Sequence, residues 1–135
     1  MFEISAIDHI VLRTENPAAM IGFYCRVLNC VIERDTGPEL GLTQLRAGTA
    51  LIDIVSVDGE LGKMGGEAPT ASGNNMDHFC LRLQPISEEM IRQHLQANGL
   101  EVAGFSRRYG AEGFGNSIYI KDPDGNTVEL RSRVG

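Results

Sequence analysis

Two histidines occupy the same place in two similar segments of the chain. His9 lies in residues 7–13 (IDHIVLR) and His78 lies in residues 76–82 (MDHFCLR), so that Asp, His, Leu and Arg recur in register. In each segment apolar and polar residues alternate, and strand-forming residues are frequent, so we expect each to form a β-strand. An amphipathic helical stretch follows each segment, which indicates two related halves facing each other across a pseudo-twofold axis.

Two carboxylates occupy equivalent positions in a second pair of segments. Asp53 lies between apolar neighbours in residues 51–54, and Glu129 does so in residues 127–130. A single acid in an apolar strand is costly to bury unless it is paired or bound to a cation. Taken alone, such an acid more often faces solvent from an antiparallel sheet, and a histidine alone is more often a packed or surface residue.

Four equivalent positions together favour a metal site. A pseudo-twofold axis would bring two imidazoles and two carboxylates around one point. Neutral imidazole and carboxylate oxygen suit Zn, Ni, Mn, Fe and Co, and two acids balance a divalent charge. We therefore expect one divalent metal ion held by His9, His78, Glu129 and Asp53.

The elements that position these residues form two β-α-β-β-β modules of an α+β fold, and such modules favour curved mixed sheets around a cavity. The first module covers residues 1–57, with expected strands at 7–13, 30–34, 40–47 and 50–57 and a helix from Asn16-Pro17 to about residue 29. Residues 58–75 are rich in Gly and lack periodicity, so we expect a linker there.

The second module covers residues 76–135 and repeats the order of the first. Its expected elements are a strand at 76–83, a helix capped by Ser87 and ending near Asn98-Gly99, and strands at 100–105, 116–121 and 127–133. We expect a polar loop at 107–115, which is either a lid over the pocket or a plain surface loop. Residues 122–126 (DPDGN) lack the ligand spacing of an EF-hand and are expected to form a hairpin turn.

Composition excludes several classes of function. The 135 residues carry a net charge of −6 without a large basic cluster, so nucleic-acid binding is not expected. No apolar run approaches the length of a membrane span, and no basic segment precedes an apolar one at the N-terminus, so we expect a cytoplasmic protein. The three cysteines form no CxxC pair, which is typical of reduced thiols.

The motifs resemble those of the vicinal oxygen chelate superfamily, which includes glyoxalase I, extradiol dioxygenases, fosfomycin-resistance enzymes, methylmalonyl-CoA epimerase and bleomycin-binding proteins. The resemblance covers essentially the whole chain. It rests on Asp8-His9-Ile10, on Phe23-Tyr24 followed by Leu28, and on residues 122–130 (DPDGNTVEL). Residues 108–119 look most like small glyoxalase I-like (lactoylglutathione lyase-like) proteins.

The resemblance implies roles for individual residues. Metal ligands come from the first, fifth and last strands of such proteins, which here supply His9, His78 and Glu129, and Asp53 stands where glyoxalase I has a fourth carboxylate. Arg13 resembles a glyoxalase I arginine that contacts glutathione. However, Val57 replaces an asparagine expected shortly after the fourth-strand acid, which weakens the case for glutathione. The expected substrate-binding residues are Arg13, Arg108 and Tyr119.

The resemblance implies chemistry in which an open metal site binds two neighbouring substrate oxygens and stabilises the negative charge that develops there. Glu129 or Asp53 would then move a proton. We therefore expect a metal-dependent lyase or isomerase acting on a small oxygenated molecule, in a homodimer that binds neither nucleic acid nor membrane.

Three alternatives stay open. An extradiol dioxygenase would need a further pocket histidine, and only His94 remains. A fosfomycin-type thiol transferase would need cations gathered around a phosphonate. Four cations are available, and the favoured interpretation is that they are solvated charges on loops and strands. A metal-free protein of the bleomycin-binding type would not need the four candidate ligands. The cations in question are Arg107, Arg108, Lys121 and Arg131.

Overall fold

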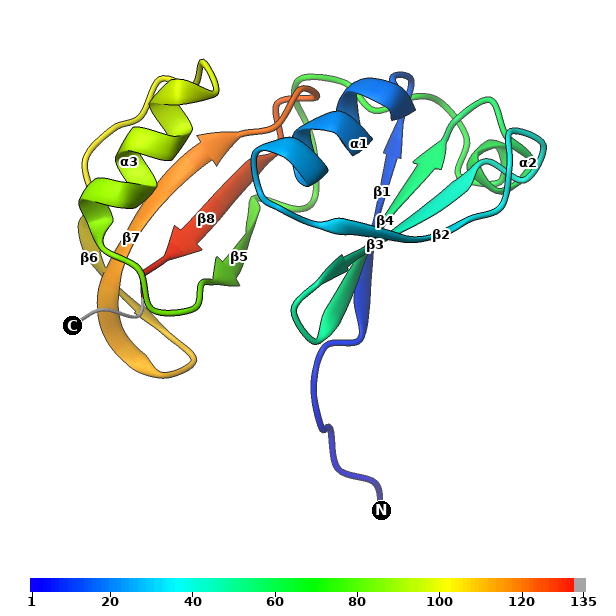
Figure 1. The fold of residues 1–135 in the computed structure, drawn as a ribbon. Helices are drawn as coiled ribbons and strands as arrows, with labels where there is room; N and C mark the ends of the chain where they lie inside the picture. Colours follow the sequence, from blue (N-terminus) through cyan, green and yellow to red (C-terminus); the bar gives the residue numbers. More distant parts are fainter. Residues whose placement is uncertain (133–135) are drawn as a thin grey trace. The chain divides into compact units, whose positions relative to one another are not determined.

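Each of the two expected modules forms its own four-stranded mixed sheet (Figure 1). The structure is a computed structural model that describes residues 1–132, and it divides into the units Met1–Ser72 and Gly73–Gly135. The end of the strand expected at 127–133, and of the module expected at 76–135, therefore lies outside the described residues. The α+β fold class and the repeated β-α-β-β-β order are confirmed.

The first unit contains one sheet and two helices, with strand order β1-β4-β3-β2. Strands β1 and β4 pair parallel, and the other neighbours pair antiparallel. In chain order the elements are β1 (His9–Thr14), α1 (Pro17–Arg26), β2 (Val31–Asp35), β3 (Leu42–Ala47), β4 (Ala50–Ser56) and α2 (Glu60–Lys63).

The second unit repeats this arrangement with strand order β5-β8-β7-β6. Strands β5 and β8 pair parallel, and the other neighbours pair antiparallel. Its elements are β5 (His78–Arg82), α3 (Glu88–Ala97), β6 (Ser106–Gly110), β7 (Gly113–Lys121) and β8 (Thr127–Arg131).

One face of each sheet is apolar and forms a core with a helix. In the first unit α1 packs on β3 and β4 and contributes Met20, Phe23 and Tyr24, all buried. In the second unit α3 lies along β7 (Figure 1), and Asn116 Nδ2 donates to Glu88 Oε2 over 2.7 Å. The buried sheet residues of the two cores are Leu12, Leu45, Ile52, Ile54, Ile118, Ile120, Val128 and Leu130.

The parallel strand pairs determine where the polar candidates lie. Register places His9 beside Leu51 and Val11 beside Asp53 in the first sheet. In the second sheet His78 lies beside Thr127, and Cys80 lies beside Glu129. Alternation along a strand then puts each histidine on the same face as the carboxylate of its own unit, with the same two-residue offset.

The ends of the helices agree in part with expectation. Ser87 caps α3, because its Oγ accepts a hydrogen bond from the Met90 amide over 3.2 Å, and Gly99 follows with a positive φ of 80°. Asn16 makes no side-chain cap bond to α1, and that helix ends at Arg26, three residues earlier than expected. Asn29 has a φ of 61°, which no helix continues through.

Residues 100–115 differ most from expectation. Residues 100–105, all described, carry no strand, and the predicted loop at 107–115 is instead the hairpin of β6 and β7. The prediction of a loop there is wrong, whereas the role of the segment as a lid stays a prediction. Strand β6 lies at the sheet edge with most of its residues exposed, so its sequence lacks the alternation of a half-buried strand.

The two segments with unusual composition also form local structure. The segment expected as a linker contains the short helix α2. The expected turn at 122–126 is confirmed, because Asp122 Oδ1 accepts hydrogen bonds from the amides of Asp124 and Asn126, both over 2.9 Å. Within residues 1–132, no helix is long and apolar enough to cross a membrane.

Candidate active site

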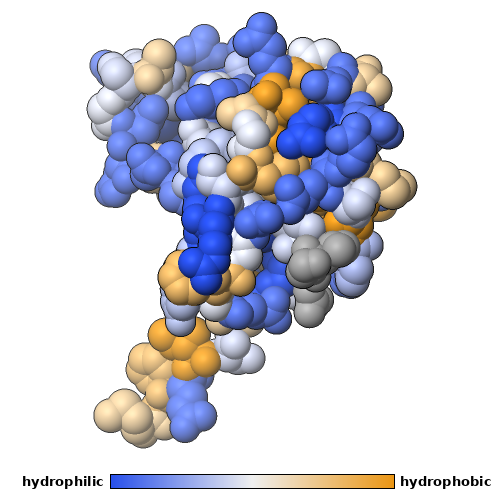
Figure 2. Space-filling view, turned by 90° about the vertical axis from the view of Figure 1, so that its left-hand side faces the viewer, coloured by the Kyte–Doolittle hydropathy of each residue, from blue (hydrophilic) through white to orange (hydrophobic). Residues whose placement is uncertain are grey.

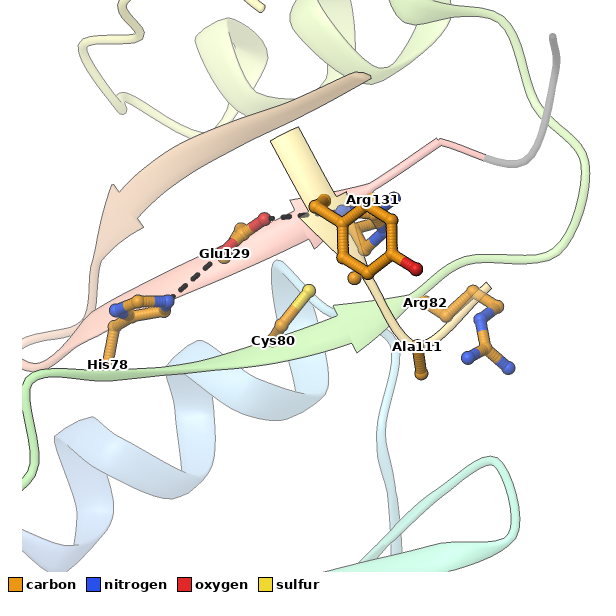
Figure 3. A pocket seen from close by; sticks show the side chains of 8 residues that line it. His78, Cys80, Arg82, Ala111, Glu129 and Arg131 are labelled. Atoms are coloured by element: carbon orange, nitrogen blue, oxygen red, sulfur yellow. Dashed lines mark ion pairs between the residues drawn. The ribbon is translucent and has the colours of Figure 1, made fainter. Parts of the chain in front are cut away.

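A pocket in the second unit contains two of the predicted metal ligands (Figure 3). His78 Nε2 lies 3.1 Å from Glu129 Oε1, and the side chain of Glu129 is only 8% exposed. The pocket has a volume of about 270 Å³ and lies on the face of β5 and β8 opposite the apolar core. A nearly buried carboxylate beside an imidazole is therefore open to a small molecule.

The second ring nitrogen of each histidine is held by the preceding aspartate. His78 Nδ1 lies 2.7 Å from Asp77 Oδ2, and His9 Nδ1 lies 2.7 Å from Asp8 Oδ2. A carboxylate on Nδ1 fixes the ring orientation and favours the tautomer that leaves Nε2 as a ligand, as is common around metal sites. The Asp-His repeat thus has a physical role in both units, which the repeated sequence alone did not identify.

The first unit carries the matching pair, His9 and Asp53. Asp53 is 4% exposed and accepts hydrogen bonds from Gln44 Nε2, at 3.3 Å to each carboxylate oxygen. The hydrogen bond to Asp8 raises the pKa of His9, and the negative charge of Asp53 adds to this, against a smaller opposing effect of burial. Gln44 in turn accepts from Arg34 Nη1 over 3.1 Å, which fixes its amide toward Asp53.

The four candidate side chains are of types that bind divalent metals. Each unit supplies one imidazole and one carboxylate, the ligand types that bind Zn, Ni, Mn, Fe and Co. Within the described residues, no group of three or more His, Cys, Asp or Glu side chains is placed to hold a metal ion. The structure thus brings the four predicted ligands together as two pairs, one in each unit.

Two predicted substrate-binding residues contact each other, and one of them, Tyr119, lies beside His78. The Arg108 guanidinium carbon is 4.2 Å from the centre of the Tyr119 ring, and the Tyr119 ring centre is 5.3 Å from that of His78. Arg108 also donates to the carbonyl oxygen and the hydroxyl of Ser117, over 2.7 and 3.0 Å. Arg108 and Tyr119 therefore form a fixed cationic and aromatic wall beside the histidine.

Arg13, the third predicted substrate-binding residue, has structural contacts in the first unit. Its guanidinium donates to the carbonyl of Gly62 from two nitrogens, at 3.2 and 2.9 Å, and to the carbonyls of Gly66 and Glu67. These bonds hold the end of α2 and the segment after it. Its guanidinium is thus engaged with the backbone of its own unit.

Six of the eight residues that line the pocket were not predicted as site residues, and three of these six bring a charge or a thiol. Arg82 and Arg131 bring positive charge, and Cys80 brings an exposed thiol. Burial raises the pKa of Cys80 to about 11, and the charge of Glu129 adds to the rise. The thiol is therefore protonated at neutral pH. The pairing of β5 with β8 places these residues together, and this long-range pairing is not visible in the local sequence.

Comparison with known proteins gives relatives along nearly the whole chain. The virulence protein STM3117 of Salmonella typhimurium is 30% identical over 133 residues, covering 97% of this chain and 86% of that protein. Its crystal structure has a TM-score of 0.78 to this structure and covers 98% of this chain and 100% of that chain.

Two structures that share the fold carry the names of enzymes or resistance proteins. Lactoylglutathione lyase from Agrobacterium tumefaciens is 20% identical, with a TM-score of 0.69 and coverage of 96% of this chain and 95% of that one. A variant of the fosfomycin resistance protein FosX from Listeria monocytogenes is 19% identical, with a TM-score of 0.68 and coverage of 96% and 91%. The latter was solved with Mn(II) and 1S,2S-dihydroxypropylphosphonic acid.

A family model matches residues 6–130, a range that includes all four predicted ligands and most of both modules. This match covers far more than half of the chain. The chain belongs to the Glyoxalase/Bleomycin resistance protein/Dioxygenase superfamily.

Proposed function

We propose that this protein is a metal-dependent lyase or isomerase of the glyoxalase type. Its substrate is a small molecule that binds the metal through neighbouring oxygen atoms. One observation carries the proposal: in each unit a histidine with its Nδ1 held by aspartate lies on the same sheet face as a nearly buried carboxylate. A protein that only bound an organic ligand would not need this doubled arrangement.

The proposed ligands of the divalent metal are His9, His78, Glu129 and Asp53. When bound, such a metal supplies Lewis-acid stabilisation of negative charge on substrate oxygens. Asp8 and Asp77 orient the two imidazoles, and Gln44 orients Asp53. The FosX complex with Mn(II) supports binding of a divalent metal in this family. Elemental analysis of the purified protein would identify the metal bound here.

Glu129 is the proposed base that moves a proton on the substrate, with Asp53 as its equivalent in the first unit. One oxygen of Glu129 lies 3.1 Å from His78 Nε2, and the other lies 3.9 Å from Arg131 Nη1. Its burial keeps most water away from the carboxylate, while the pocket leaves it open to a ligand. A carboxylate in this position can take the proton from the hydroxyl-bearing carbon next to a substrate carbonyl and return it to the carbonyl carbon, while the hydroxyl proton passes to the carbonyl oxygen.

The test is substitution of the base. With metal-loaded protein, we would screen hemithioacetals of 2-oxoaldehydes and 2-hydroxy ketones for isomerisation by NMR. Glu129→Gln should lower the rate by roughly 10²- to 10⁴-fold, the usual contribution of a positioned base. The exposed Glu101→Gln is the matched control and should leave the rate unchanged. Full activity of Glu129→Gln would remove Glu129 from this role.

The dioxygenase alternative receives less support from the position of the remaining histidine. His94 lies in the last turn of α3 and is exposed, whereas the pocket lies on the opposite face of the sheet from the buried residues of that helix. It therefore does not supply the further pocket histidine that this reaction needs.

We also propose that the protein is a cytoplasmic homodimer. Strand β2 is a sheet edge whose residues are all exposed, including Val31 at 64% and Ile32 at 50%. The N-terminal segment, residues 1–8, projects with largely hydrophobic colouring in Figure 2, and Phe2 and Ile4 are more than four-fifths exposed. Exposed apolar edges of this kind favour pairing with another chain.

A further inference from the structure

We propose that the pocket of the second unit binds the carboxylate of a small organic acid, with Arg131 as the anchor and Arg82 beside it. This proposal names the substrate class of the proposed function. It rests on that function for the reaction that the rest of the ligand undergoes. Binding of the carboxylate itself requires neither a metal nor turnover.

Arg131 is built into the pocket wall by backbone contacts. Its side chain is 11% exposed, and it donates from Nη2 to the Gly113 carbonyl over 2.9 Å and from Nη1 to the Arg108 carbonyl over 3.4 Å. A Cβ at Gly110 or at Gly115 would come within 2.8 Å of the guanidinium. The glycines of the β6–β7 hairpin therefore make room for this one side chain to lie against the sheet.

The positive charge of Arg131 is only partly balanced by protein groups. Within residues 1–132, the carboxylate that pairs with Arg131 is that of Glu129, whose Oε2 lies 3.9 Å from Nη1, beyond hydrogen-bond distance, while Glu129 Oε1 faces His78. A guanidinium has five N–H donors, and the two carbonyl bonds leave others for a ligand. Its planar fork matches the two oxygens of a carboxylate.

Arg82 adds a second cation to the same pocket. It lies beside Arg131 in the pairing of β5 with β8, and its Nε is 3.0 Å from Glu112 Oε1. This bond ties Arg82 to the turn between β6 and β7 and offsets part of its charge. The charged groups that line the pocket are thus two arginines and Glu129, with His78 beside them.

The size of the pocket limits the acid. A volume of about 270 Å³ equals roughly nine water molecules at the ~30 Å³ each takes in the liquid. A ligand enclosed there has on the order of ten non-hydrogen atoms. With its carboxylate on Arg131, its other end lies toward Glu129 and His78, since Figure 3 shows Glu129 between His78 and Arg131.

Cys80 is a built-in reporter of this site, because its exposed thiol lines the pocket. We would alkylate the full-length, metal-free protein with iodoacetate and with iodoacetamide and follow each cysteine by mass spectrometry. Both reagents react with the thiolate. The rate with iodoacetate divided by the rate with iodoacetamide therefore does not depend on the fraction of thiolate. The charges of Arg82, Arg131 and Glu129 sum to one net positive charge beside Cys80. The iodoacetate-to-iodoacetamide ratio should therefore be about fivefold higher at Cys80 than at Cys25, as expected for attraction by one net charge.

Variants assign the effect to the two arginines. Arg131→Gln should bring the ratio at Cys80 to that of Cys25, and Arg82→Gln should lower it in part. Arg92→Gln on α3 removes the same charge outside the pocket and should leave the ratio unchanged. If Arg131→Gln fails to fold, Arg82→Gln and ligand protection of the wild-type protein decide the matter.

Protection distinguishes a carboxylate from other anions. Propanoate should slow alkylation of Cys80 by iodoacetamide without slowing that of Cys25, and propanamide should not. Equal reagent ratios at Cys80 and Cys25 in the wild-type protein would overturn the proposal, as would protection by methylphosphonate but not by propanoate. Loss of the proposed metal-dependent function would leave this labelling unchanged, so the two failures are distinguishable.

Discussion

At the scale of single residues, the Asp-His dipeptides orient the two imidazoles that we propose as metal ligands. Asp8 and Asp77 each accept from a ring Nδ1 over 2.7 Å, although both carboxylates are about nine-tenths exposed. Since an exposed carboxylate gains little from such a bond, its value lies in fixing the tautomer of the ring. The consequence is measurable at His9.

The pKa of His9 should lie above its ordinary value of 6.5, because Asp8 hydrogen-bonds to the protonated ring. The raised pKa stabilises the fold below pH 6.5, and this contribution is lost as pH rises through the higher folded value. A pH titration of the His9 ring by NMR checks this. Asp8→Asn should lower the pKa toward 6.5, and a wild-type value at or below 6.5 would contradict the assignment.

The sequence predicted the four candidate ligands because the chain repeats itself. Asp53 and Glu129 were identified as a pair only through that repeat, and the register of β1 with β4 and of β5 with β8 gives them the same offset from His9 and His78. Arg131 resembles any solvated strand charge in the sequence. Its place in the pocket depends on glycines in another hairpin, which is a long-range relation.

At the scale of elements, α2 is held against the first sheet by a close backbone contact. A Cβ at Gly62 would lie 1.8 Å from the carbonyl oxygen and 2.6 Å from the carbonyl carbon of Ser56, and both of these atoms belong to the backbone. Arg13 donates to the Gly62 carbonyl and so depends on the same approach. The contact explains why a helix forms within a segment whose composition indicates a linker.

Gly62→Ala should therefore lower the free energy of unfolding by about 1–3 kcal/mol or more, since the backbone must move to admit the methyl group. Gly104→Ala is the matched control, because nothing lies within 4 Å of its added Cβ and its φ is not positive. The control should change stability by at most about 1 kcal/mol. Equal stability of the two variants in urea unfolding would show that α2 does not pack this closely.

Elements with a clear local signal were predicted, and elements without one were not. The β-branched residues of β4 favour a strand, and Ser87 gives α3 its cap. The edge strand β6 shows no alternation of apolar and polar residues, so the chain from 100 to 115 was assigned wrongly. The four-residue helix α2 is shorter than any window in which a helical period can be recognised.

At the scale of the whole molecule, the sequence predicted the α+β class and the doubled module because both modules carry the same order of elements. The sequence did not determine how chains associate, because exposed apolar residues do not identify the surface that covers them. Val31 and Ile32 on β2 are the strongest candidates for an interface within the described chain.

The proposed homodimer makes a mass prediction. Light scattering of the wild-type protein should give twice the mass of one chain, and Ile32→Glu should shift it toward one, because a charge at a paired apolar edge is costly to bury. Met64→Glu changes another exposed apolar residue, outside β2, and should leave the mass unchanged. A wild-type protein of single-chain mass would contradict the dimer.

We propose that the two imidazole–carboxylate pairs bind one divalent metal. The most direct test of this proposal is elemental analysis of protein purified without added metal, in the wild type and in His78→Ala. We predict about one equivalent of Ni, Zn, Co or Mn per chain in the wild type and its loss in the variant. Iron instead would favour the dioxygenase. No metal in the wild type, with none taken up on addition, or full retention by His78→Ala, would contradict the account.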